Sequence, residues 1–138
     1  MGQIEYFYPH PIKIDEESTS DWITAVVAAE NDSIQTISLH FLSRSALREI
    51  NKDHLAHDYE TDVITFDHSI GRGLCADIMI SPDNVAENAS DLGVSFKDEL
   101  DRVMVHGILH LLDYDDKEDD QRRVMREKED HYLTLRPS

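Results

Sequence analysis

The chain has 138 residues, 40% hydrophobic and 30% charged, which suffices for one solvated domain and is too short for two independent cores. Its formal net charge of −16 excludes a uniformly basic nucleic-acid-binding surface, although a binding site needs only a local basic patch. A single cysteine, no secretory signal and no apolar run near the roughly 20 residues that span a bilayer predict a cytoplasmic protein without membrane contact.

The first half of the chain divides into two strands and two helices. The β-prone run IEYFY, bounded by prolines, predicts a short strand over residues 4–8, and apolar residues at helical spacing predict a helix over residues 15–30. Alternation of apolar and polar residues then predicts a strand over residues 34–42. Ser43 is a suitable N-cap for a short helix over residues 44–52.

The second half follows a polar loop rich in histidine and aspartate. Pro82 suits the first turn of a helix capped by Ser81, and Ser95 with Asp98 resembles a capping box at the start of another helix. The patterns predict strands over residues 63–66 and 74–80 and helices over residues 82–92, 96–112 and 118–133. About four strands and five helices in mixed order predict an α+β fold, with a mixed sheet, in a single compact domain over residues 1–138.

The most informative stretch is VHGILHLLDYDD at residues 105–116. His106 and His110 are four residues apart, so a helix places both imidazoles on one side, where they can bind one zinc ion. Asp116 lies ten residues after His106, the offset at which the metzincin pattern has its third ligand, and its carboxylate suits zinc. We therefore expect His106, His110 and Asp116 to hold one Zn²⁺ per chain, with a zinc-bound water as the catalytic group.

Two neighbouring residues refine this interpretation. Gly107 stands where zinc peptidases carry their glutamate base, which argues against a peptidase, and its small size lets another element pack close. Asp113 marks the end of the helix and tolerates left-handed backbone better than most residues. The alternative is that two histidines near the end of a helix are structural, but the helix break at Asp113 and a third candidate ligand at the matching offset favour a metal site.

The segment from His106 to Asp116 resembles the signature of the YbeY endoribonuclease family, H-G-x-L-H-L-x-G-Y-D-H, at seven of its nine specified positions. Upstream, TDVITF at residues 61–66 resembles the family's T-D-V-L-S-F strand, and ADI at residues 76–78 resembles its G-D-I segment. The resemblance implies a zinc-dependent single-strand endoribonuclease acting in 3′-end maturation of small-subunit (16S) rRNA and in ribosome quality control. It also implies RNA and the small ribosomal subunit as partners, and not DNA.

The chain departs from the family pattern at three positions. Asp116 replaces the third histidine, which keeps a ligand and makes the site more anionic, and Asp113 replaces the turn glycine. Leu55 stands where many members carry a functional arginine before the T-D-V strand. This last change puts phosphate binding in doubt, because no apolar side chain replaces the bidentate guanidinium.

Other polar residues have both a functional and a structural interpretation. Asp62 and Asp77 either orient a metal-bound histidine from behind or simply fix loops. His40 is expected to be half-buried with a partner. A basic stripe on one helix face is either solvated or follows RNA phosphates, and it consists of Arg44, Arg48 and Lys52. A second polar cluster consists of His54, His57 and Asp58. Three arginines are expected to pair with acidic neighbours along one helix, namely Arg122, Arg123 and Arg126.

Two alternative functions remain open at this level. One is a zinc hydrolase that acts on another substrate, such as a peptide or a small phosphoester. The other is a ribosome-associated binding protein whose metal is structural, which Leu55 and the acidic composition keep in consideration. An open coordination position on the metal distinguishes the hydrolases from the binding protein.

Overall fold

The computed structural model describes residues 2–55 and 61–137, without the side chains of residues 54 and 55. These residues form a four-stranded sheet and five helices in one domain, which confirms the α+β class. In chain order the elements are β1 (Gln3–Phe7), α1 (Glu16–Ala29), β2 (Ile34–Phe41), α2 (Arg44–Leu55), β3 (Val63–Asp67), β4 (Leu74–Ile80), α3 (Pro82–Leu92), α4 (Phe96–Leu111) and α5 (Asp119–Leu133). The largest difference from the expected boundaries is at α2, which continues to Leu55.

The sheet has the strand order β1-β2-β4-β3 and is mixed. Strand β2 pairs in parallel with both β1 and β4, whereas β3 is antiparallel to β4. Helix α1 provides the crossover that two parallel neighbours such as β1 and β2 require. The connection from β3 to β4 instead turns through Gly71 and Gly73, whose φ angles of 78° and 87° favour glycine.

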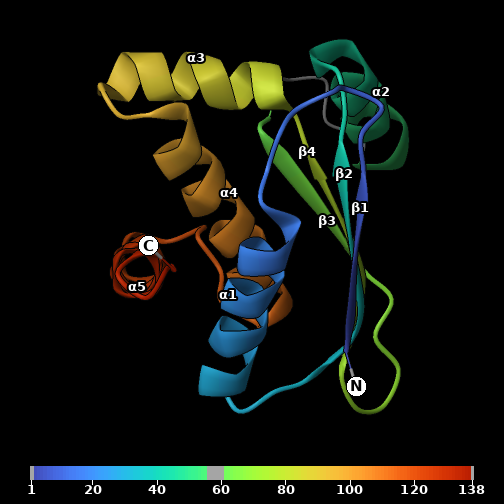
Figure 1. Ribbon diagram of the computed structural model, residues 1–138, viewed down its shortest axis with the longest axis vertical. Helices are drawn as coiled ribbons and strands as arrows, with labels where there is room; N and C mark the ends of the chain where they lie inside the picture. The colour runs from blue at the N-terminus through green and yellow to red at the C-terminus, as the bar shows by residue number, and fades with distance from the viewer. Residues whose placement is uncertain (1, 56–60, 138) are drawn as a thin grey trace.

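One face of the sheet forms the core. In β4, Leu74, Ala76, Ile78 and Ile80 are buried and the residues between them are half-buried, as alternation along a strand requires. Figure 1 shows α1 and α4 along the same side of the sheet, with α5 outside α4. The indole of Trp22 ties the layers together, because it is buried and its Nε1 donates to the carbonyl oxygen of Tyr132 in α5 (2.8 Å).

Helix α4 is the central element of the domain and contacts β3, β4, α1, α3 and α5. Its N-terminus is capped by Ser95, whose side chain accepts a hydrogen bond from the Asp98 backbone. A Cβ atom on Gly107 would lie 3.3 Å from Ile78 Cγ2 and 3.4 Å from Thr65 Cγ2. Glycine therefore lets α4 lie close to β3 and β4, as its small size predicts.

The C-terminus of α4 is a Schellman motif. The backbone N–H of Asp113 bonds the carbonyl of His110 (3.1 Å), and that of Tyr114 bonds the carbonyl of Leu109 (3.0 Å). Asp113 has a φ of 74°, the left-handed conformation that glycine usually adopts at this position. The chain consequently reverses direction directly after His110. None of the helices in the described parts of the chain has the length and apolar character needed to cross a membrane.

Candidate metal centre

Three side chains converge where α4 ends. His106 and His110 lie one turn apart on α4, and Asp116 follows the reversal of the chain. The two Nε2 atoms are 3.1 Å apart, and Asp116 Oδ2 is 3.3 Å from His106 Nε2 and 3.5 Å from His110 Nε2. Among the described residues, this is the one group of at least three metal-binding side chains whose ligand atoms all lie within 4.8 Å of one another.

The dimensions of this triangle suit a zinc ion. In a tetrahedral site with bonds of about 2.0–2.1 Å, neighbouring ligand atoms are about 3.3 Å apart. The three observed separations, 3.1, 3.3 and 3.5 Å, are close to that value. Two imidazoles and a carboxylate also form a donor set that zinc accepts, with a fourth position left for water. The geometry shows a possible metal-binding group and does not identify the metal.

Glu129 fixes the orientation of His106. Glu129 is buried (5% of the residue is exposed), and His106 Nδ1 donates to Glu129 Oε2 (2.6 Å). With its proton on Nδ1, a neutral His106 keeps its lone pair on Nε2, the atom that faces His110 and Asp116. His110 Nε2 lies at hydrogen-bond distance from this atom (3.1 Å), so without a metal a proton lies between the two nitrogens, and a metal cation would take its place. A carboxylate behind a histidine is also the usual support of a metal ligand.

Burial and the neighbouring negative charges have opposite effects on the pKa of His106. Burial favours the neutral ring and by itself lowers the pKa of His106, but the hydrogen bond and charge of Glu129, with Asp116 and Asp62, raise the pKa above its ordinary value. In the absence of a metal, this environment therefore attracts a proton to the imidazole. The same negative charges attract a metal cation.

Arg102 holds Glu129 in place. Its Nη1 donates to Glu129 Oε1 (2.8 Å) and its Nη2 to Asp130 Oδ1 (2.7 Å). Because α5 packs against α4 and turns Glu129 inward, Glu129 pairs with an arginine of α4 rather than with one of its own helix. Its buried position within an otherwise charged helix is the signal that identifies it, and that signal requires the tertiary structure.

Two contacts hold the segment that carries Asp116. Tyr114 donates to Glu30 Oε1 (2.6 Å), a carboxylate that also accepts hydrogen bonds from Tyr132 and Lys128. These donors lower the pKa of Glu30 below its ordinary value although burial acts to raise it. From α5, Arg122 Nη1 donates to the backbone carbonyl of Asp116 (3.3 Å). The segment that carries Asp116 is therefore attached to both α1 and α5.

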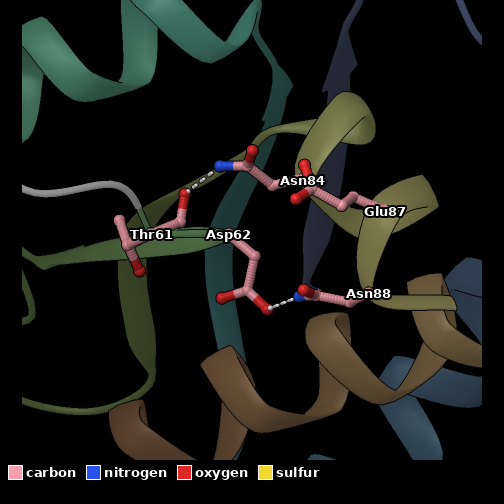
Figure 2. A pocket seen from close by; sticks show the side chains of 5 residues that line it. All are labelled: Thr61, Asp62, Asn84, Glu87 and Asn88. Atoms are coloured by element: carbon pink, nitrogen blue, oxygen red, sulfur yellow. Dashed lines mark hydrogen bonds between the residues drawn. The ribbon is translucent and has the colours of Figure 1, made fainter. Parts of the chain in front are cut away.

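A polar cavity of about 340 Å³ lies between α3 and the start of β3. Figure 2 shows Asn88 pointing toward the carboxylate of Asp62 and Asn84 pointing toward Thr61. Asn88 Nδ2 donates to Asp62 Oδ2 (3.2 Å), and Asn84 Nδ2 donates to the carbonyl of Thr61 (2.7 Å). Asp62 is thus anchored to α3, and burial raises its pKa above the ordinary value. Glu87 completes the lining.

Asp62 also lines a second cavity, of about 290 Å³, together with His106 and Glu129. The two cavities are therefore neighbours that share one wall. No hydrogen bond joins Asp62 to His106 among the described residues, but the charge of Asp62 contributes to the raised pKa of His106. Asp62 lies beside the metal-ligand group without holding either imidazole.

Asp77 lies elsewhere. Its Oδ1 bonds His40 Nε2 (2.8 Å) and its Oδ2 bonds His68 Nε2 (3.0 Å). Ile78 faces Gly107 of α4, so alternation along β4 turns Asp77 to the opposite face of the sheet. The structure thus brings Asp77 to His40 and His68 rather than to His106 or His110. His40 has the half-buried, partnered position that its strand predicts.

The basic stripe lies on α2 and begins beside the first cavity. Arg44 Nη2 bonds Glu87 Oε2 (2.6 Å), whereas Arg48 and Lys52 are exposed side chains further along the helix. The second polar cluster is not placed: His57 and Asp58 lie outside the described residues, as does the side chain of His54. The side chain of Leu55 also lies outside them.

The comparisons with known proteins agree with one another. A family model described as Endoribonuclease YbeY matches residues 7–135. The chain is similar to the Endoribonuclease YbeY of Flavobacterium psychrophilum, with 44% identity over 133 residues, or 96% of this chain and 95% of that protein. It is also similar to the Endoribonuclease YbeY of Bacteroides thetaiotaomicron, with 40% identity over 123 residues, or 89% and 90% of the two chains.

A solved structure has the same fold. The solution structure of TM1509 from Thermotoga maritima superposes with a TM-score of 0.64 and 27% sequence identity. The match covers 94% of this chain and 86% of that chain. The similarity therefore extends over nearly the whole domain and is not confined to the histidine motif.

Proposed function

Because the chain belongs to the YbeY endoribonuclease family, we propose that it is a zinc-dependent endoribonuclease that cleaves single-stranded RNA. Within rRNA processing, its proposed task is 3′-end maturation of small-subunit rRNA and ribosome quality control, with the small ribosomal subunit as its partner in the cytoplasm. The observation that carries the proposal is the convergence of His106, His110 and Asp116, with Glu129 behind His106.

The residues of the site have distinct tasks in this proposal. His106, His110 and Asp116 hold the metal, Glu129 keeps His106 in the tautomer that presents Nε2, and Arg102 keeps Glu129 in place. When bound there, zinc supplies Lewis acidity toward a phosphoryl oxygen and lowers the pKa of water. The Asp116 carboxylate adds negative charge where many relatives of this type have a neutral histidine, which weakens that acidity.

The basic stripe on α2 is proposed to guide RNA toward this site. Arg44 contacts Glu87, which lines the first cavity, and Asp62 joins that cavity to the one beside His106. A strand lying along Arg48 and Arg44 would therefore continue toward the metal ligands. The net charge of −16 does not oppose this proposal, because it is a sum over the whole chain and RNA binding needs only a local basic surface.

A ribonuclease assay tests the proposal. Purified protein, either zinc-loaded or stripped by a chelator and dialysed, is incubated with a labelled single-stranded RNA and with the same sequence in a duplex. We expect cleavage of the single strand by the zinc-loaded protein, none by the stripped protein, and recovery when zinc returns. His106→Ala, purified identically, reports any contaminating nuclease. Cleavage that survives both treatments would exclude a metal-dependent mechanism, and zinc binding without cleavage would support a structural metal.

The charge of Asp116 provides a sharper test of the chemistry. Asp116→His should retain zinc and move the alkaline rise of the pH–rate profile to lower pH, because a neutral ligand leaves the metal more Lewis acidic. Asp116→Ala should weaken zinc binding and abolish cleavage. If Asp116→Ala binds zinc and cleaves like the wild type, Asp116 is not a ligand.

Salt dependence tests the stripe separately. Replacing Arg44, Arg48 and Lys52 together with alanine should reduce the slope of log affinity against log salt by about 2, since each phosphate contact on a single strand contributes about 0.7. Fluorescence anisotropy with a labelled single-stranded RNA measures this slope. An unchanged slope would show that the stripe is only a solvated helix face.

A further inference from the structure

The cavity beside His106 has an arginine on its outer wall. Arg126 of α5 lines it together with Asp62, His106 and Glu129. A second hollow of about 340 Å³ runs on from it between α4 and α5 and shares Glu99, Arg102 and Arg126 with it. Arg126 thus lies on the wall that the two hollows have in common, and one of these hollows reaches His106.

Arg126 differs from the other arginines nearby in what its guanidinium contacts. Arg122 pairs with Asp119 and bonds backbone carbonyls, and Arg123 pairs with Asp120 (3.7 Å) and Glu127 (3.4 Å). Arg102 uses both terminal nitrogens on carboxylates. These guanidinium groups hold the protein together and have little capacity for a ligand.

Arg126, by contrast, is exposed and forms no hydrogen bond or ion pair with any described residue. Burial and the charge of Asp62 raise the pKa of the buried Glu99, and the positive charge of Arg126 acts to lower it. The sequence predicts that Arg126 pairs with acidic residues along α5, and the structure contradicts this. Its guanidinium donors are therefore available to a ligand in the groove that Arg126 lines.

On the basis of the proposed function, we infer that Arg126 binds a phosphate of the RNA substrate beside His106. A guanidinium offers two parallel N–H groups to two phosphate oxygens, a geometry that lysine does not reproduce. The carboxylates of Asp62 and Glu99 would repel a phosphate in this groove, so the substrate needs a cation there in addition to the metal. Leu55, at the sequence position of the family arginine, has no group for such a contact.

Arg123 provides a matched control for the test, because it lies on the same helix and carries the same charge but is already paired on the outer surface. Arg126→Gln, Arg126→Lys and Arg123→Gln are compared with the wild type, all zinc-loaded and checked for zinc content and thermal unfolding. We expect Arg126→Gln to lower kcat/KM for a single-stranded RNA by about tenfold or more. Arg126→Lys should restore it in part, and Arg123→Gln should change it less than about twofold.

A binding measurement keeps this inference distinct from the proposed activity. Anisotropy with a labelled six-nucleotide oligouridylate should show weaker binding by Arg126→Gln and a salt slope reduced by about 0.7, even if the protein does not cleave the RNA. Equal effects of Arg123→Gln and Arg126→Gln would show that RNA binding depends only on the total charge of the helix, and would overturn the inference. Loss of zinc in Arg126→Gln would also overturn it, as would failure of the wild type to bind RNA at all.

Discussion

Two groups of two histidines and one aspartate lie on opposite sides of the sheet. In the first, His106, His110 and Asp116 direct three ligand atoms toward one point, within 4.8 Å of one another. In the second, Asp77 lies between His40 and His68 and bonds each through a different oxygen. Two histidines and one aspartate thus form in one place a group that suits a metal and in the other a group that is satisfied by its own hydrogen bonds.

The difference comes from the backbone that carries each group. Helical spacing of four places His106 and His110 one above the other, and the Schellman turn returns the chain to bring Asp116 alongside. On the sheet, His40 projects from β2, Asp77 from β4, and His68 follows β3, so the carboxylate lies between the two rings. Asp77 therefore bonds each ring separately, whereas the two rings of α4 and Asp116 converge.

The largest expected effect is loss of the metal from the convergent group. His110→Ala removes one of three ligands, and we expect zinc content, measured by elemental analysis of purified protein, to fall from about one per chain to a small fraction. His68→Ala, which removes a histidine from the other group, should keep the full content. Equal metal loss in both variants, or none in His110→Ala, would abolish the distinction between the two groups.

A smaller effect is expected from the carboxylate behind each histidine. Glu129→Gln keeps the shape but weakens the support of His106, so zinc affinity and cleavage should fall about 10- to 100-fold. The matched change Asp77→Asn affects only His40 and His68 and should leave both quantities unaltered. Competition with a chelating dye measures the affinity. Unchanged zinc affinity in Glu129→Gln would show that Glu129 does not support His106 as a ligand and serves only in the ion pair with Arg102.

The attachment of the Asp116 segment should appear in stability. Glu30→Gln weakens the hydrogen bonds from Tyr114, Tyr132 and Lys128, and we expect the free energy of unfolding at pH 7 to fall by about 2 kcal/mol. Because the native pKa of Glu30 is lowered, its stabilisation is complete above the ordinary pKa of the carboxyl group. It is lost as the pH falls through the native value.

Urea denaturation of Glu30→Gln and the wild type at pH 7 and at a pH below the native pKa of Glu30 measures this difference. The gap between the two proteins should narrow in acid. Glu49→Gln, an exposed position on α2, makes the same chemical change outside the network and should not alter stability. A constant gap across pH would mean that Glu30 acts through packing rather than charge.

The smallest expected effect concerns the turn itself. Asp113 adopts a left-handed φ of 74°, so Asp113→Gly should stabilise the protein by about 1 kcal/mol without altering zinc content. Urea denaturation and elemental analysis test both parts. If the variant lost stability or zinc, the aspartate side chain itself would have a role in the convergent group.

Much of the fold could be predicted from local pattern. Ser81 before Pro82 and the alternation from Leu74 to Ile80 gave α3 and β4 their observed boundaries, because capping and the period of a strand are local properties. The spacing of His106 and His110 is likewise a local property of a helix. Asp116 could be proposed as their neighbour only from its offset, since nothing local shows how the chain turns.

The roles of Asp77, Glu129 and Arg126 were decided by tertiary structure. Alternation along β4 turns Asp77 away from the helix whose histidines it was a candidate to orient, while the packing of α5 on α4 turns Glu129 inward to His106 and leaves Arg126 beside the cavity. The sequence by itself determined the elements, the family resemblance and the ligand spacing. Which charged residues of α5 meet α4 depends on how the two helices pack, and contacts between residues more than 20 positions apart leave no periodic signal in the sequence.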